Sequence, residues 1–457
     1  MIYDDFSRRV IKMLSMTADS EDKLRTFLLG RILGLERHEY VAVAWSFAYF
    51  FCVLSSYYIL RPVREEMAVA SGASTIPYLF VGTFITMIFA TSAFGWVASR
   101  FPRRTFLPWV YLFFVANMFI FWALFSQLRG SGADYVWLGR IFFVWVSVFN
   151  LFVVSVFWSF MADIYTREQG RRLFGVITAG GSIGALIGGM ITSSLVTTIG
   201  FQRLIPLSAV VLLAAVLCIG RLKDWVHQAH EDDIDRTVES SEPLGGNPLA
   251  GLTHLFSSKY FLGIALMSVV ASLLGTALYM FRAELIEAAI LSPDARTRFF
   301  SNMNNAQNAL ALVAQMFLVK QVVTRFGIGR SLVLFPLASI VGFAILAFEP
   351  TLMAVAILDV VRRGLGFGFA KPSTDMLYSV VTPEEKYKTK NAIDTAVYRG
   401  GDVVGTWCIK FLSLLGMGIA AISVLMLPFA LISAVVALWL GRDYRRRARE
   451  LKMIGVK

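Results

Sequence analysis

The segment Tyr58–Arg61 reads YILR and ends the first long apolar run of the chain. A matching segment, Tyr279–Arg282 with the sequence YMFR, ends the seventh such run, 221 residues later. Two further landmarks recur at nearly this spacing: Arg100 returns as Arg325, and the glycine pair 180–181 returns as 400–401. Because three landmarks recur in one order, we predict a tandem duplication of a membrane-spanning unit, which is typical of secondary transporters.

The composition is that of a membrane protein. Of the residues, 57% are hydrophobic and 16% are charged, and the mean hydropathy is +0.65, whereas soluble domains carry about 25% charged residues. Twelve apolar runs of about 20 residues are each long enough to cross a hydrocarbon layer of about 30 Å as a helix. We therefore predict an all-α polytopic membrane protein with twelve transmembrane helices in two pseudo-symmetric six-helix bundles. The predicted spans are 40–61, 76–98, 106–126, 135–162, 173–198, 204–220, 260–281, 301–322, 331–349, 351–377, 392–415 and 418–440.

These spans define the predicted domains. A cytoplasmic or interfacial amino-terminal segment covers residues 1–39, in which 24–35 could lie flat on the membrane. The amino-terminal bundle covers 40–220, and the carboxy-terminal bundle covers 259–440. A polar cytoplasmic linker, 221–258, connects them, and residues 441–457 form a basic cytoplasmic tail.

The net charge of +12 could suggest a nucleic-acid partner, but its distribution indicates another origin. Most Lys and Arg residues lie in the termini and in the loops on one side of the predicted spans, which places both termini in the cytoplasm. This basicity suits contact with anionic lipid. We expect membrane lipids and a small anionic solute as partners, no nucleic-acid polymer, and a monomer.

Cysteine and histidine positions do not support an enzyme. Three cysteines lie inside apolar runs, and four histidines lie outside every predicted span, without metal-ligand spacing. We expect no catalytic residue, metal or cofactor. The residues are Cys52, Cys218 and Cys408, and His38, His227, His230 and His254.

The loop between the second and third spans carries a recognisable motif. Gly95–Arg104 (GWVASRFPRR) resembles the loop signature of the major facilitator superfamily, with Ser99 where that family usually has Asp. A related loop surrounds Arg325 in the second half. The resemblance implies a gating role for the basic residues of both loops, which are Arg100, Arg103, Arg104, Arg325 and Arg330.

Three longer segments resemble the ATP/ADP translocase family of plastids and intracellular bacteria. Tyr58–Glu65 is similar to its first helix, Phe157–Gly175 to its fourth-to-fifth helix connection, and Lys371–Gly401 to its tenth-to-eleventh helix region. The resemblance implies a divergent member with a major-facilitator-like fold, nucleotide exchange and a place in a bacterial inner membrane. Asn150 stands where the family has an acidic residue on the fourth helix, and it is a further candidate for solute binding.

Charged residues inside the spans are the candidate substrate ligands. A charge within the bilayer costs several kcal/mol, so such side chains normally face a cavity or a partner. The superfamily resemblance implies that spans one, four, seven and ten line a central cavity, and guanidinium groups there would bind an anion. These residues are Arg61, Arg64, Arg282, Arg362, Arg363 and Lys371. Alternatively, Arg61 could extend toward the outer interface.

Neighbouring polar residues have more than one interpretation. Asp359 can neutralise either Arg362 or Arg363 on its helix face, which leaves the other for solute. Asp394, Arg399 and Asp402 in span eleven could form structural pairs or a coupling relay. Four further residues could contact solute, or could instead hold helices together and form an aromatic belt; these are Asn304, Asn308, Tyr58 and Tyr279.

The sequence thus predicts a secondary transporter that moves an organic anion by alternating access. A nucleotide or another phosphorylated metabolite is the favoured solute, and exchange is the favoured mode. One alternative is a proton-coupled carrier that titrates Asp359, Asp394 or Asp402. Another is a membrane receptor or scaffold that has the same fold and does not transport.

Overall fold

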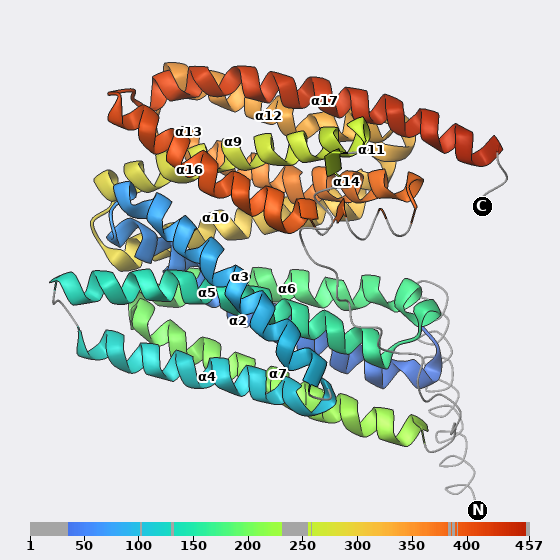
Figure 1. Cartoon of the computed structure of the whole chain (residues 1–457). Helices are drawn as coiled ribbons and strands as arrows, with labels where there is room; N and C mark the ends of the chain where they lie inside the picture. The colour runs from blue at the N-terminus through green and yellow to red at the C-terminus, as the bar shows by residue number, and fades with distance from the viewer. Residues whose placement is uncertain are drawn as a thin grey trace, which may run out of the picture.

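The computed structural model describes residues 35–100, 103–128, 132–230, 255–256, 258–382, 385, 389–390 and 392–453. Six long helices follow one another in the first half of the chain, and Figure 1 shows their arrangement. They are α2 (Tyr40–Ala70), α3 (Ile76–Arg100), α4 (Arg103–Gln127), α5 (Gly132–Ile164), α6 (Arg167–Ile199) and α7 (Phe201–His230). Short 3-10 turns, η1 (Arg37–Glu39) and η2 (Ala73–Thr75), precede α2 and α3.

The second half repeats this succession with interruptions. Its continuous helices are α9 (Lys259–Ala289), α12 (Ile328–Phe348) and α17 (Ile419–Met453). Between α9 and α12 lie α10 (Pro293–Val313), η3 (Ala314–Leu318) and α11 (Val319–Phe326). Between α12 and α17 lie first α13 (Leu352–Leu365), η4 (Gly366–Ala370), α14 (Lys371–Leu377) and η5 (Tyr378–Val380). They are followed by η6 (Ile393–Val397) and α16 (Tyr398–Leu414).

Nine helices in the described part of the chain are long and apolar enough to cross a membrane. The three other predicted spans, 301–322, 351–377 and 392–415, are helical as well, but each contains a π-helical segment, namely η3, η4 and η6. Gly366 and Gly368 lie in η4, where weak helix propensity favours such a distortion. Single π-turns within helices often occur at functional sites.

Several helices continue beyond their predicted spans, and two of them cross a predicted domain boundary. Helix α7 continues to His230, ten residues beyond position 220, where we expected the linker to begin. Helix α17 continues to Met453 through most of the expected basic tail. Residues 1–34 and 231–254, which include the expected interfacial helix and most of the linker, lie outside the described residues.

A row of glycines on α6 allows close contact with α2. A β-carbon at Gly180, Gly184 or Gly188 would collide with the backbone of Phe47, Phe51 or Ser55, respectively. Each of these glycines is four residues from the next, so they share one helix face. The small-residue packing expected in membranes therefore fixes α6 against α2.

The two halves meet at one end of the molecule. Figure 1 shows the start of α2 and the end of α17 on the same side, which we call the termini end; the turns at residues 71–75 and 290–292 mark the opposite end. One apolar cluster joins the halves near this opposite end and contains Ala68, Leu79 and Ile286. The remaining two clusters each belong to one half.

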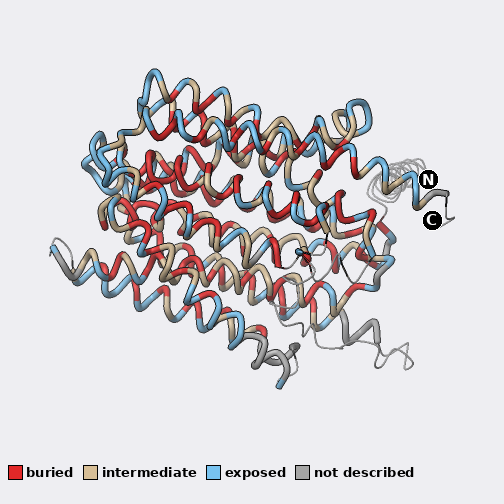
Figure 2. The backbone as a smooth tube through the Cα atoms, turned by 45° about the horizontal axis from the view of Figure 1, so that its top comes forward, coloured by how far each residue is buried: buried red, intermediate tan, exposed pale blue. Residues whose placement is uncertain are grey.

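Burial follows the helix faces. Figure 2 shows buried residues between helices and exposed residues on outward faces and at the ends. Large apolar side chains are among the exposed ones, including Phe89 at 71% and Leu217 at 72%. Exposed apolar surface of this extent suits hydrocarbon rather than water.

Candidate functional site

A continuous chain of five charged side chains crosses the boundary between the halves. Arg64 Nη1 lies 2.8 Å from Glu65 Oε1, and Glu65 Oε2 lies 3.0 Å from Arg282 Nη2. Arg282 Nη1 lies 2.7 Å from Asp359 Oδ2, whose Oδ1 accepts from Arg363 Nε at 3.0 Å. The chain therefore links α2 of the first half to α9 and α13 of the second.

Two more helices hold this chain in place. From α5, Ser147 Oγ accepts a hydrogen bond from Arg64 Nε at 2.9 Å, and the Arg64 guanidinium lies 3.8 Å from the Phe143 ring centroid. From α10, Gln307 Nε2 donates to Asp359 Oδ2 at 3.1 Å. Side chains from five helices thus converge on one charged cluster.

Arg61 and Arg362 belong to this region but differ from the other arginines. In the described part of the chain, neither forms an ion pair with a carboxylate. Arg61 Nη1 donates to the Tyr58 hydroxyl at 3.1 Å, which donates to Asn308 Oδ1 at 3.2 Å. Arg362 Nη2 donates to the carbonyl oxygen of Ala271 at 2.5 Å, and its guanidinium lies 4.8 Å from the Phe335 ring centroid.

Together these residues form a cluster with excess positive charge, in which Arg282 and Arg362 are buried and Arg61, Arg64 and Arg363 are half-buried. Five arginines face two carboxylates, Glu65 and Asp359, which are 5% and 1% exposed. Arg362 is 5% exposed. Removing such charges from water is costly unless opposite charges and hydrogen bonds compensate. The excess of three guanidinium groups over carboxylates can be balanced by an anionic ligand, and guanidinium matches the geometry of phosphate oxygens.

A second polar contact region lies at the opposite end, and sequence reasoning missed it. Arg296 Nη1 on α10 lies 3.5 Å from Glu66 Oε1 on α2. The backbone nitrogen of Phe201 donates to Asp294 Oδ1 at 2.9 Å, and that of Ala73 donates to Glu287 Oε2 at 2.9 Å. These contacts join the two halves and close them against each other at this end.

Lys371 lies away from the charged cluster. Its Nζ is 2.9 Å from Asp394 Oδ2 and 3.7 Å from Asp375 Oδ1, and the side chain is 48% exposed. Lys390 Nζ lies 2.8 Å from the same Asp375 oxygen. The structure thus places Lys371 in a group of ion pairs between α14 and the start of the eleventh span.

The other predicted polar residues occupy varied positions. Arg399 Nη1 lies 3.7 Å from Asp402 Oδ2, and Asp402 also accepts a hydrogen bond from Ser272. Tyr279 is buried, with Arg282 5.0 Å from its ring centroid. Asn304 is buried and Asn150 is half-buried.

The predicted gating residues lie at or near the ends of helices. Arg100, Arg325 and Arg330 are exposed near the termini end. The side chains of Arg103 and Arg104 lie outside the described part of the structure.

Glu65 and Gln307 are central to the cluster, and sequence reasoning did not select them as site residues. Glu65 follows Arg64, so the two resemble a self-neutralising pair at the end of a span. A carboxylate inside an apolar span is itself a signal of function. Its partner Arg282 is 217 residues away, which no local pattern indicates.

The helix arrangement and the buried charges define a polytopic membrane protein of the secondary-transporter class, with its charged site between two helical halves. Residues 45–406 match the Major Facilitator Superfamily. The chain belongs to this superfamily.

Comparison with individual proteins agrees with this assignment. The chain is 22% identical to ADP,ATP carrier protein 2 of Chlamydia pneumoniae, over 94% of each chain. It is 23% identical to the chloroplastic ADP,ATP carrier protein 1 of Arabidopsis thaliana, over 86% of this chain and 71% of that protein. Among solved structures, the nucleoside transporter NupG is similar, with a TM-score of 0.57 and 16% identity over 89% of this chain and 98% of that one. The chain is thus a divergent relative of the ADP/ATP carriers.

Proposed function

We propose that the protein is a secondary transporter that exchanges a nucleotide or a closely related phosphorylated anion across a bacterial inner membrane. The observation that carries this proposal is the excess of arginine over carboxylate in the cluster that joins the halves. The names of the ADP,ATP carrier relatives support a nucleotide over other anions.

Arg61 and Arg362 are the residues that we assign to the solute phosphates. Both are free of carboxylates in the described part of the chain, whereas Arg64, Arg282 and Arg363 are engaged by Glu65 or Asp359. The hydroxyl of Tyr58 and the amide of Asn308 adjoin Arg61. They supply polar contacts beside the Arg61 guanidinium.

Alternating access follows from the way the halves are joined. With both termini in the cytoplasm, the contacts of Glu66, Asp294 and Glu287 close the periplasmic end. Exchange requires these contacts to open while the termini end closes. The Glu65–Arg282 pair also joins the halves, so an arriving anion can compete with Glu65 for Arg282 and loosen that connection.

Counterflow in proteoliposomes tests this function. Proteoliposomes loaded with unlabelled ATP should accumulate labelled ADP without a pH gradient, and empty ones should not. Uptake that requires a pH gradient would favour the proton-coupled alternative. Failure of ATP, ADP and inorganic phosphate under all conditions would favour a non-transporting receptor.

A further inference from the structure

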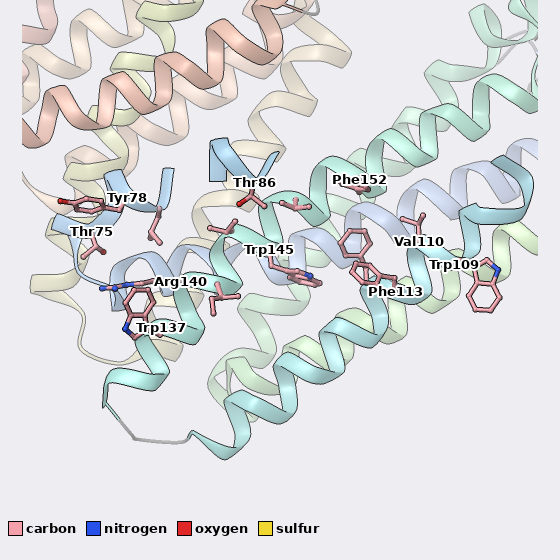
Figure 3. A pocket seen from close by; sticks show the side chains of 15 residues that line it. Thr75, Tyr78, Thr86, Trp109, Val110, Phe113, Trp137, Arg140, Trp145 and Phe152 are labelled. Carbon is pink, nitrogen blue, oxygen red and sulfur yellow. The ribbon is translucent and has the colours of Figure 1, made fainter. Parts of the chain in front are cut away.

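A pocket of about 1100 Å³ lies between α3, α4 and α5, within the first half of the molecule (Figure 3). Its volume exceeds the range of about 300–1,000 Å³ that is usual for small-molecule sites. Aromatic and aliphatic side chains form most of its wall, including Trp109, Phe113 and Trp145. The charged cluster contributes none of its lining residues, so this pocket is separate from the proposed solute site.

One face of α5 forms the floor of the pocket, and we call this apolar floor the trough. Ile141, Val144, Val148 and Phe152 line it, and their spacings of three and four residues place them on a single helix face. From Ile141 to Phe152 this face extends about 16 Å at 1.5 Å per residue. That length matches about half of a 30 Å hydrocarbon layer, or one leaflet.

A cation lies at one end of this apolar trough. Figure 3 shows Arg140 and Trp137 together at one end and Trp109 at the other. The Arg140 guanidinium lies 4.6 Å from the Trp137 ring centroid. Its Nε is buried and has no hydrogen-bond partner among the described residues, and no carboxylate in the described chain is within ion-pair distance of it.

The position of Arg140 along α5 corresponds to a headgroup boundary. The apolar span Tyr135–Ile164 has its middle near Asn150, about 15 Å from Arg140 along the helix axis. This distance is about half the hydrocarbon thickness. Trp137 lies one turn further out and is 61% exposed, as expected of a tryptophan at a membrane interface.

A second cation adjoins the same end from the other half of the protein. Tyr78 lines the pocket, and Lys410 Nζ on α16 lies 4.2 Å from its ring centroid. Lys410 is also 5.2 Å from the Trp407 ring centroid. The headgroup end of the trough thus has two cations and three aromatic rings.

We propose that this pocket binds an anionic phospholipid, with one acyl chain along α5 and the phosphate beside Arg140. The trough supplies apolar surface one leaflet long, and Arg140 supplies an unpaired charge where a headgroup lies. Lys410 adds a charge from the second half while the halves are closed at this end. The lipid therefore favours this closed arrangement of α3 and α16.

Native mass spectrometry of the purified full chain tests the site with phosphatidylglycerol and phosphatidylcholine as probes. Wild type should retain phosphatidylglycerol in preference to phosphatidylcholine. Arg140→Gln should weaken phosphatidylglycerol binding about fivefold, or about 1 kcal/mol. Val148→Trp, which fills the trough, should release both lipids. The matched control is Arg203→Gln, an exposed arginine on α7, which should bind like wild type.

Three results would overturn the proposal. They are equal retention of the two lipids by wild type, unchanged phosphatidylglycerol binding in both Arg140→Gln and Val148→Trp, and displacement of the lipid by ATP. Displacement by ATP would place a solute in this pocket. The thermal midpoint of each variant shows whether it is folded before binding is compared.

Discussion

Glu65 on α2 and Arg282 on α9 form a buried ion pair, 3.0 Å between Oε2 and Nη2, that joins the two halves of the protein. Each residue also has a second charged partner: Glu65 pairs with Arg64, and Arg282 pairs with Asp359. Removal of Glu65 leaves Arg64 without a carboxylate partner, whereas removal of Arg282 leaves Glu65 paired with Arg64 and Asp359 paired with Arg363.

A double-mutant cycle measures this pair. Glu65→Gln should lower the free energy of unfolding by about 3–5 kcal/mol, because it leaves the Arg64 guanidinium without its carboxylate partner. Arg282→Gln should lower it by less, because Glu65 keeps its pair with Arg64 and Asp359 keeps its pair with Arg363. The loss of unfolding free energy in the double variant should be smaller than the sum of the two single losses by at least about 1 kcal/mol, since the two residues are in contact. Thermal unfolding in detergent provides the measurement.

The pair Arg446–Asp443 on α17, whose arginine is exposed and whose aspartate also pairs with Arg447, serves as the control for that cycle. Arg446 is 68% exposed, so Arg446→Gln should lower the free energy of unfolding by less than about 1 kcal/mol. Strict additivity of the Glu65 and Arg282 variants would contradict a direct interaction between them.

The glycine face of α6 gives a packing prediction. Gly184→Ala should destabilise the protein by about 1–3 kcal/mol, because the added methyl group meets the backbone of Phe51 and forces the helices apart. Gly175→Ala on the same helix is the matched control, since its β-carbon would have open space. Equal thermal midpoints for the two variants would argue against this helix contact.

The closed end of the molecule can be locked covalently. In a background without Cys52, Cys218 and Cys408, a short bifunctional methanethiosulfonate reagent should join the cysteines of the pair Ala73→Cys and Glu287→Cys, because the Glu287 side chain spans the distance to the Ala73 backbone across the halves. Cross-linking should stop exchange, and a reductant, which cleaves the disulfides to the reagent, should restore it. The two single-cysteine variants are the controls. Full transport by the cross-linked double variant would show that this end need not open.

The fold was predictable because it depends on local patterns. Apolar runs of membrane length and the recurrence of Tyr58–Arg61 as Tyr279–Arg282 indicated repeated helical spans, and helices fill those positions. The π-helical segments were not predictable, since backbone register within an apolar helix leaves no regular pattern. Helix α7 exceeds its predicted length because a helix can continue into polar sequence beyond the hydrocarbon layer.

The charged site was predictable only in part. Arginines inside apolar spans were visible as costly residues that need a partner. Which carboxylate meets which arginine depends on tertiary structure, as the pairing of Arg282 with Glu65 shows. The sequence favoured Lys371 as a solute ligand. Its ion pair with Asp394 forms only when α14 meets the eleventh span, whereas Asp375 lies four residues away on the same helix.

The most direct test of the central claim is equilibrium binding of ADP and of uncharged adenosine to purified wild type, Arg61→Gln and Arg362→Gln. Each lost charge-assisted hydrogen bond is worth about 1.5–3 kcal/mol. Each variant should therefore bind ADP about tenfold to a hundredfold more weakly. The exposed Arg203→Gln on α7 serves as a binding control and should match wild type. We predict that wild type binds ADP far more tightly than adenosine and that both cluster variants lose this preference. Equal affinity of wild type for ADP and adenosine, or unchanged ADP binding in both cluster variants, would contradict the account.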